Sequence, residues 1–198
     1  MTTNRFTRRF VLIAFPILLS SGCGQGPASE DIADSAAEQP IGIQETFPDS
    51  PGLIRTEIVN AAGRLVTVGY WLDRKKTGAW TDYTQDDRVF RLTTYVAGKK
   101  EGIYLELNTI NQVTVRCFYH NDQRHGKYTE YAPEFLREER FYNNGKQDGI
   151  TSVYSAPGKL IEQGYYKDGL REGISKWYDG AGNLTLQYEY HKGELVKK

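Results

Sequence analysis

The sequence has few cysteines, no net charge, and no long hydrophobic run beyond its N-terminal segment. Only two of its 198 residues are cysteine, Cys23 and Cys117. The N-terminal pattern assigns Cys23 to a lipid, which leaves Cys117 without an intramolecular partner. We therefore expect a domain that holds together without a disulfide in an oxidising compartment, with Cys117 as a small, partly buried apolar filler. The absence of a later apolar stretch predicts a mature protein that is soluble unless it is tethered.

The balance of charge excludes one class of partner. The formal net charge is zero, but three arginines lie near the N-terminus and residues 25–54 carry acids without any lysine or arginine. The rest of the chain has a net charge of only about +3, with acids interspersed among the basic residues. It therefore lacks the clustered positive charge that is typical of nucleic-acid-binding proteins.

Motifs that carry chemistry are also lacking. There is no Gly-rich phosphate loop between a strand and a helix, no Gly-x-Ser-x-Gly elbow, and no set of spaced Cys/His ligands. His120 and His125 flank a predicted turn, with Asp122 between them, and could in principle form a metal site. However, His120 and His191 occupy a repeat position that varies between units, so a solvated loop is the better interpretation. Asp86-Asp87 lies in a turn, and Glu138-Glu139 lies on a strand whose successive side chains point to opposite faces. We expect no enzyme, no cofactor and no metal.

Residues 1–22 are predicted to be a lipoprotein signal peptide. Arg5, Arg8 and Arg9 form a basic start, residues 10–19 form an apolar core, and small residues precede Cys23. This pattern is similar to the bacterial signal in which the cysteine is acylated and becomes the first mature residue. Thr7-Arg8-Arg9-Phe10 weakly resembles a twin-arginine motif, but the strongly apolar core favours the general secretory route.

Residues 23–53 are predicted to be a flexible acidic linker after the lipidated cysteine. The segment is rich in Ala, Ser, Glu, Asp, Gly and Pro and has almost no aromatic residue, so it cannot bury enough surface to fold alone. Gly24 follows Cys23 where an inner-membrane retention signal would tend to have Asp. We therefore expect an anchor at the outer membrane of a bacterial cell envelope, facing the periplasm.

A glycine recurs at a nearly fixed interval through residues 54–198. The steps are 24, 24, 23 and 24 residues, which defines an internal repeat. An aromatic residue stands seven positions before each glycine, an aromatic or leucine stands five after it, and an aliphatic residue stands thirteen before it. The glycines are Gly78, Gly102, Gly126, Gly149 and Gly173; the three columns are Trp71, Tyr95, Tyr119, Tyr142 and Tyr166; Tyr83, Leu107, Tyr131, Tyr154 and Tyr178; and Leu65, Val89, Val113, Leu136 and Leu160, continued by Leu184.

Each unit is predicted to form two strands joined by a tight hairpin turn. In the last full unit, Asp168-Gly169 separates two apolar and aromatic runs, and glycine can take the positive φ that such a turn requires. The same slot holds Ala97-Gly98, Asn144-Gly145 and Lys192-Gly193. The first and third units have Asp73-Arg74 and Asn121-Asp122 instead, for which we expect looser hairpins or a different turn.

A two-residue turn would also set which side chains face one another. The aromatic residue would lie opposite the position two before the glycine, which holds Lys76, Lys100, Arg124, Gln147 and Arg171. Each ring would then have a cation across from it in four of five units, a contact of about 0.5–1 kcal/mol at an exposed site. The bare glycine on the same face leaves room for neighbouring tyrosines to lie over the backbone.

These residues resemble the MORN-type repeat in its bacterial variant form, also found in proteins termed YwqK-family antitoxins. The best match runs from Tyr142 through Gly145-Lys146 and Gly149 to Tyr154. The resemblance implies an all-β fold: an elongated, single-layer antiparallel meander of stacked β-hairpin repeats of about 24 residues. It constrains function poorly, because known members are scaffolds, membrane-associated modules or suspected antitoxins.

The remaining candidate for function is the first aromatic column. Tyr95, Tyr119, Tyr142 and Tyr166 form a candidate binding face, with the alternative that the rings only cover one another. We expect a non-catalytic, lipid-anchored scaffold that binds an unknown protein partner. The other hypothesis is an antitoxin or immunity protein that neutralises a toxin by direct binding. A glycan or an anionic headgroup is a further ligand that exposed aromatic and basic residues can bind.

Overall fold

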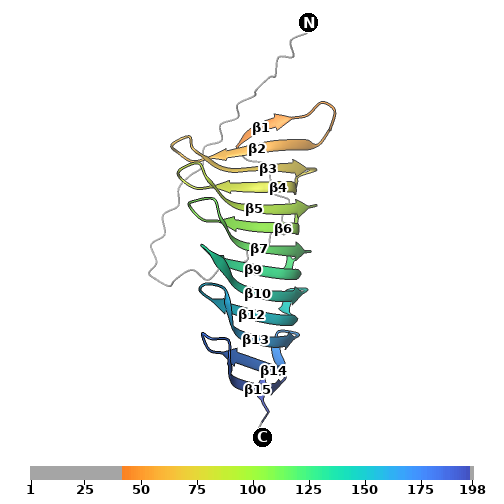
Figure 1. The fold of residues 1–198 in the computed structure, drawn as a ribbon. Coiled ribbons are helices and arrows are strands. Elements are labelled where there is room, and N and C mark those ends of the chain that lie inside the picture. Colours follow the sequence, from red (N-terminus) through yellow and green to blue (C-terminus); the bar gives the residue numbers. More distant parts are fainter. Residues whose placement is uncertain (1–41, 197–198) are drawn as a thin grey trace, which may run out of the picture.

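The described residues of the computed structural model, 42–196, form one open antiparallel sheet of 16 strands (Figure 1). Neighbouring strands in the sheet are neighbours in the chain, so the topology is a meander. The predicted all-β, single-layer antiparallel fold is confirmed. The strands are β1 Ile43–Thr46, β2 Leu53–Val59, β3 Leu65–Leu72, β4 Lys75–Tyr83, β5 Val89–Val96, β6 Lys99–Leu107, β7 Val113–His120, β8 Gln123–Arg124, β9 Gly126–Ala132, β10 Phe135–Asn143, β11 Lys146–Gln147, β12 Gly149–Ser155, β13 Lys159–Lys167, β14 Leu170–Tyr178, β15 Leu184–His191 and β16 Glu194–Leu195.

The predicted signal peptide, Cys23 and the linker up to residue 41 lie outside the described residues. The last part of the predicted linker does not match the structure, because Ile43–Thr46 forms β1 and pairs with β2. Glu45 lies opposite Arg55 and 3.5 Å from its guanidinium, a contact that the composition of the linker alone does not reveal. The sheet thus begins before the expected boundary at residue 54. Within residues 42–196 we find no helix with the length and apolar character needed to span a bilayer.

All six two-residue hairpin turns between residues 42 and 196 have the same conformation. The first central residue has a φ of 46–51° and the second a φ of 64–88°, which is the left-handed pair of a type I′ turn. The expectation of a different turn at Asp73-Arg74 and Asn121-Asp122 is wrong. Asp and Asn tolerate the left-handed region because their short side chains bond locally, and Arg74 adopts it as well. The right-handed twist of the flanking strands favours this turn in every unit.

The repeat glycine marks an irregularity in each hairpin. Its φ lies between 64° and 129° in all five units, a region that favours glycine. The register between the two strands shifts at Gly69, Thr94 and Gly164 in three units, and the second strand is interrupted at His125 and Asp148 in the other two. Bulges of this kind bend a strand and re-aim its side chains.

Few residues in the described part of the chain are buried, as a single-layer sheet requires. The buried apolar side chains are Trp71, Trp80, Cys117 and Tyr128, and the buried polar ones are Thr56, Thr93, Thr129, Thr151, Ser152 and Ser175. The predicted filler Cys117 is 2% exposed in β7, opposite Tyr104. Small residues are needed there because the large rings of neighbouring strands occupy the space above them.

Candidate functional site

The predicted pairing of aromatic and basic residues is present in four of the five units. Across the short turns, Trp71 lies opposite Lys76, and the same pairing recurs in each later unit, with Gln147 as the uncharged partner of Tyr142. The other pairs are Tyr95–Lys100, Tyr119–Arg124 and Tyr166–Arg171. We call the sheet face that carries these pairs the aromatic face, and the opposite side the open face.

Each repeat glycine lies directly opposite the aromatic residue of the next unit. The pairs are Gly78–Tyr95, Gly102–Tyr119, Gly126–Tyr142, Gly149–Tyr166 and Gly173–Tyr190. The missing side chain therefore leaves room for the ring of the following unit. This relationship joins consecutive units into one continuous column.

The four predicted binding-face tyrosines lie in this column, and all are half-buried. Their rings pack edge-to-face on neighbours and against cations, which are the favourable geometries for aromatic and cation–π contacts. Tyr95 lies 6.2 Å from the Trp80 ring and 5.5 Å from Lys76 Nζ. Tyr119 lies 5.7 Å from Tyr104, with Lys100 Nζ 5.3 Å from its ring.

The same pattern continues toward the C-terminal units. Tyr142 lies 6.0 Å from Tyr128 and 5.6 Å from the Arg124 guanidinium. Arg171 lies 5.4 Å from the Tyr166 ring, and its Nη2 atom donates to the Tyr166 hydroxyl at 3.0 Å. Most contacts of the column tyrosines are therefore made with neighbouring rings and cations of the same face.

Carboxylates pair with three of the arginines on the aromatic face. Arg91 Nε donates to Asp82 at 2.6 Å, Arg140 forms a fork with both oxygens of Glu138 at 2.6 and 2.5 Å, and Arg171 bonds Glu162 at 2.7 Å. Bidentate pairs of this kind hold their geometry well. As predicted for Glu138-Glu139, the two acids diverge, since Glu139 instead pairs with Lys127.

Burial shapes the chemistry of the ionisable groups on this face. It raises the pKa of Tyr128 to about 12, reinforced by the Glu130 carboxylate. It also raises the pKa of the Cys117 thiol to about 11, and it raises the pKa of Tyr104, which in addition donates to Glu106. These groups are therefore protonated near neutral pH and suited to packing and hydrogen bonding.

The side of the sheet where the two-residue turns lie, called here the short-turn edge, contains a recurring hydrogen bond that the sequence analysis missed. In three units the residue just before the repeat glycine is an acid whose carboxylate accepts a backbone N–H from the turn of the next unit. Glu101 Oε2 accepts from Asn121 at 3.0 Å, while its Oε1 lies 3.0 Å from His120 Nδ1. Glu172 bonds Lys192 N and His191 Nδ1 in the same way, at 2.7 and 3.0 Å.

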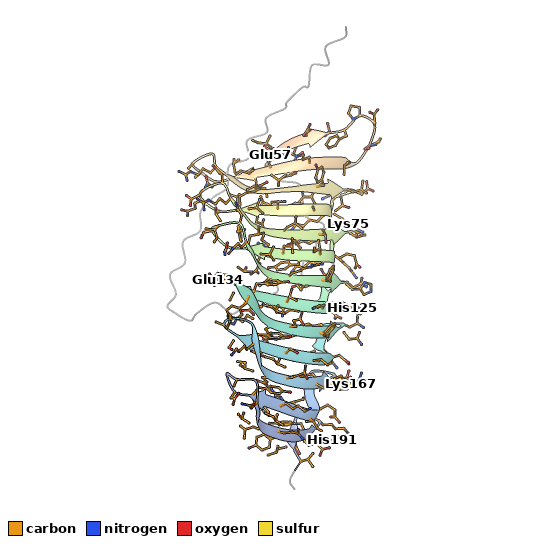
Figure 2. All side chains as sticks on the ribbon, viewed as in Figure 1. Glu57, Lys75, His125, Glu134, Lys167 and His191 are labelled. Atoms are coloured by element: carbon orange, nitrogen blue, oxygen red, sulfur yellow. The ribbon has the colours of Figure 1, made fainter. Side chains whose placement is uncertain are left out.

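Asp148 contributes a third instance, since its Oδ2 accepts the Asp168 N–H at 3.5 Å and also lies 2.8 Å from Lys167 Nζ. Figure 2 shows Lys75, His125, Lys167 and His191 along this one edge, with Glu134 at the other. The His120 and His125 rings are 5.8 Å apart. Among residues 42–196 no group of three or more His, Cys, Asp or Glu side chains could hold a metal ion.

The open face carries a second feature that the sequence analysis missed, a row of exposed apolar side chains. Its five members, called here the outer apolar row, are 36–50% exposed and lie on β7, β10, β12, β13 and β14: Phe118, Phe141, Ile150, Tyr165 and Ile174. On β9, between β7 and β10, Lys127 lies opposite Phe141. They stand one position before the aromatic column or one after the repeat glycine. Strict alternation along each strand could have revealed them, because neighbours of an inward-facing ring must point to the other face.

No protein-family model matches the chain, and no curated protein matches it. The class is defined by the structure itself: an all-β antiparallel meander of hairpins, consistent with a repeat protein.

Proposed function

We propose that this chain is a non-catalytic scaffold that binds a protein partner through the open face of its sheet. The observation that carries the proposal is the outer apolar row. Its members are at least one-third exposed, and with strands about 4.8 Å apart the row runs for about 24 Å. Contiguous apolar patches on a protein surface mark interaction sites.

Charged groups beside the row fit the anatomy of a protein interface. Lys127 lies opposite Phe141 and pairs with Glu139, and the Arg116 guanidinium lies 5.6 Å from the Phe118 ring. A centre of aromatic and aliphatic side chains with a polar rim is typical of protein–protein contacts. A glycan or an anionic headgroup fits this row less well, because its centre offers few hydrogen-bond donors.

The aromatic face is the weaker candidate on geometric grounds. Tyr95, Tyr119, Tyr142 and Tyr166 are engaged with neighbouring rings and with cations, so a ligand would have to displace those contacts. This favours the alternative that the column covers itself. Binding through the four tyrosines stays a prediction that the experiments below can decide.

We also propose a MORN-type family membership and a lipid anchor on Cys23 at the outer membrane, facing the periplasm. The repeat pattern around Tyr142 to Tyr154 supports the first, and the small residues before Cys23 with Gly24 after it support the second. A linker of about 20 residues before β1 would reach about 25 Å as a random coil. That reach would present the sheet to partners away from the lipid surface.

The proposal is tested by crosslinking the full chain in intact cells, followed by affinity capture and mass spectrometry. A row variant combines Phe118→Ser, Phe141→Ser and Tyr165→Ser. A matched control combines Leu72→Ser, Val96→Ser and Leu170→Ser, which lie on the same face beside the short turns and are 43–58% exposed. We expect the row variant to lose a partner that the control retains, and the purified partner to bind it about tenfold more weakly or worse.

Equal capture by both variants, with circular dichroism showing both folded, would overturn binding through the row. Capture of a toxin as the row-dependent partner would favour the antitoxin hypothesis over a scaffold.

A further inference from the structure

The open face contains a second column in which one unit departs from the rest. The residues five positions after the repeat glycine are tyrosine in four units, and each pairs with an aliphatic residue on the next strand, as Tyr83 does with Val89. In the second unit the position holds Leu107, which pairs with Val113. The tyrosine column is therefore interrupted at one place.

The same unit carries an all-aliphatic cross-strand pair on the open face. Leu92 and Leu105 are cross-strand partners on β5 and β6. The equivalent pair in each other unit contains at least one polar side chain: Val68–Thr81, Arg116–Thr129, Glu139–Ser152 and Gln163–Lys176. Among the five units of residues 42–196, this pair is thus all-aliphatic only in the unit that lacks the tyrosine.

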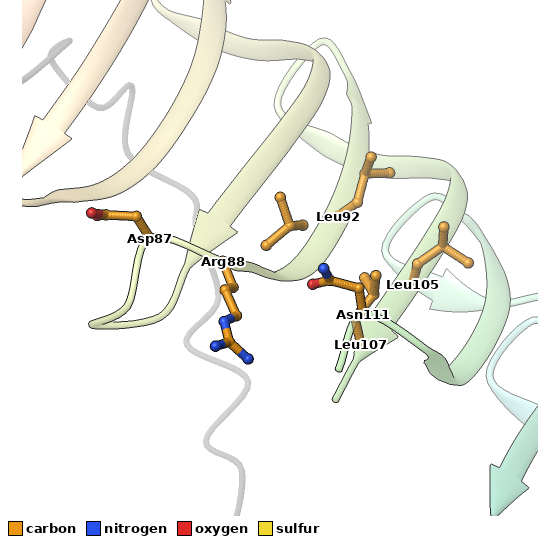
Figure 3. A pocket seen from close by; sticks show the side chains of 7 residues that line it. Asp87, Arg88, Leu92, Leu105, Leu107 and Asn111 are labelled. Carbon is orange, nitrogen blue, oxygen red and sulfur yellow. The ribbon is translucent and has the colours of Figure 1, made fainter. Parts of the chain in front are cut away.

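A hollow of about 530 Å³ opens at this position (Figure 3). Val89, Leu92, Leu105 and Leu107 form its floor, and the loop residues Asp87 and Asn111 stand at its rim. An apolar floor with a few polar groups at the edge is the usual composition of a ligand pocket.

The walls of the hollow are held in place by hydrogen bonds. The Thr84 hydroxyl accepts the backbone N–H of Arg88 at 3.3 Å, and Asn108 Oδ1 accepts that of Gln112 at 3.0 Å, so each loop is closed on itself. Arg88 Nη1 donates to the Thr109 carbonyl and joins one loop to the next. The hollow is thus largely formed before any ligand arrives, which reduces the entropic cost of binding.

The hollow is continuous with the outer apolar row. Ile103, Leu105 and Leu107 alternate onto the same face of β6. Ile103 pairs with Phe118, the first member of the row. A partner segment bound along the row beyond Phe118 would therefore place a side chain in the hollow.

We propose that this hollow is a specificity pocket that receives an aromatic side chain, phenylalanine or tyrosine, from the protein partner of the open face. The inference rests on the proposed function and names what that partner inserts. Every other unit places its own tyrosine in this column, so a ring fits the local geometry. Aromatic side chains bury large apolar areas, and interface energy concentrates in such anchors.

The direct test uses the full chain with methyl-labelled leucine and valine and N-acetyltyrosinamide as the probe. Methyl spectra should show saturable shifts at Val89, Leu92, Leu105 and Leu107, with a dissociation constant on the order of 1 mM for so small a ligand. N-acetylleucinamide should bind several-fold more weakly.

Leu107→Tyr supplies the decisive variant, because it restores the residue that the repeat itself uses there and is expected to fold. It should weaken the probe about tenfold or more by occupying the pocket. Leu170→Tyr is the matched control, since Leu170 is 49% exposed on the same face and lies outside the hollow. Absence of saturable shifts, equal binding of both probes, or equal binding by Leu107→Tyr would each overturn the pocket.

The two proposals fail separately. If Leu107→Tyr retains the crosslinked partner while the row variant loses it, the scaffold function stands and the pocket falls. If the row variant retains the partner, the proposed binding through the outer apolar row is wrong, and the pocket proposal that rests on it fails as well.

Discussion

The indole of Trp80 lies directly over Gly69. A β-carbon added at Gly69 would fall 2.1 Å from Cδ2 of the ring, and Trp80 Nε1 donates to the Tyr70 carbonyl at 3.1 Å, which holds the indole in place. Gly69 is buried, and its backbone is not in the left-handed region, so packing rather than backbone strain requires a glycine here.

Gly69→Ala should therefore destabilise the fold by about 1–3 kcal/mol, the usual range for overpacking. Gly180→Ala is the control, because a β-carbon there meets nothing within 4 Å and the φ is unremarkable; its effect should stay within about 0.5 kcal/mol. Urea unfolding of both variants measures the difference, and equal stabilities would contradict the assigned contact.

Loss of the aromatic column should damage folding before it damages binding. The variant Tyr119→Ser, Tyr142→Ser and Tyr166→Ser removes three half-buried rings together with their cation contacts. Each site should lose about 1 kcal/mol or more of stability from burial and ring contacts.

Thermal unfolding followed by circular dichroism provides the measurement. The row variant of the open face, with three exposed residues changed in the same way, serves as its control and should melt close to the wild type. If the column variant has the same melting temperature as the row variant but loses the partner, the binding site includes Tyr119, Tyr142 and Tyr166 instead of the row.

Stability should decline in acid through the short-turn edge. Hydrogen bonds from His120 and then from the Asn121 N–H lower the pKa of Glu101, and the Lys167 ammonium lowers that of Asp148. The Lys192 N–H lowers that of Glu172. A carboxylate with a depressed folded-state pKa contributes stability above its unfolded pKa of about 4, and that contribution is lost as the pH falls through the folded value.

The triple variant Glu101→Gln, Asp148→Asn and Glu172→Gln should accordingly show a smaller drop in melting temperature than the wild type between about pH 5 and pH 3. Asp49→Asn with Glu134→Gln, two exposed loop acids, controls for the general loss of negative charge. If all three proteins lose the same number of degrees, these edge carboxylates do not carry the acid sensitivity.

One whole unit should be removable without loss of the fold. Excision of residues 149–172 joins Asp148 to Gly173, so that Asp148 takes the position of Glu172 and can accept the Lys192 N–H. The sheet loses two strands and keeps its alternation, and such arrays tolerate changes in unit number.

Excision of residues 149–160 is the contrasting deletion, because it removes a single strand and reverses the direction of those that follow. Urea unfolding should be cooperative for the first variant and broad or absent for the second. Equal tolerance of both deletions would argue against a periodic sheet.

The lipid anchor depends on one sulfur atom. Cys23→Ala should abolish labelling by a fatty-acid analogue and block normal signal processing, because a thioether-linked lipid requires that sulfur. Metabolic labelling and membrane fractionation measure both effects, with Cys117→Ala as the control. A Cys23→Ala variant that is processed and remains with the membranes would refute the lipoprotein hypothesis.

The hairpins and their internal register could be predicted because they depend on local chain geometry. A two-residue turn leaves only one register for the residues beside it, so Tyr166 opposite Arg171 follows from counting. Side-chain contacts between one unit and the next could not be predicted by counting residues in this way. Glu101 bonds the turn at Asn121 only because stacking places the two turns side by side.

Which face a side chain occupies was decided partly by irregular pairing. Simple alternation back from Tyr95 would place Val89 on the aromatic face, since the two residues are six positions apart, an even number. The register shift between β4 and β5 instead pairs Val89 with Tyr83 on the open face, where it helps to form the hollow. A bulge reverses the alternation after it, and its position depends on both strands.

By itself, then, the sequence determined the repeat length, the two strands per unit, the tight turns and the aromatic–cation pairs, since all of these arise within about 24 residues of chain. Only the tertiary structure decided how the units stack, that Trp80 covers Gly69, and that the apolar side chains of the open face gather into a row beside a hollow. The physical reason is that bulges and stacking contacts depend on pairing between whole strands, which the alternation within any one strand does not specify.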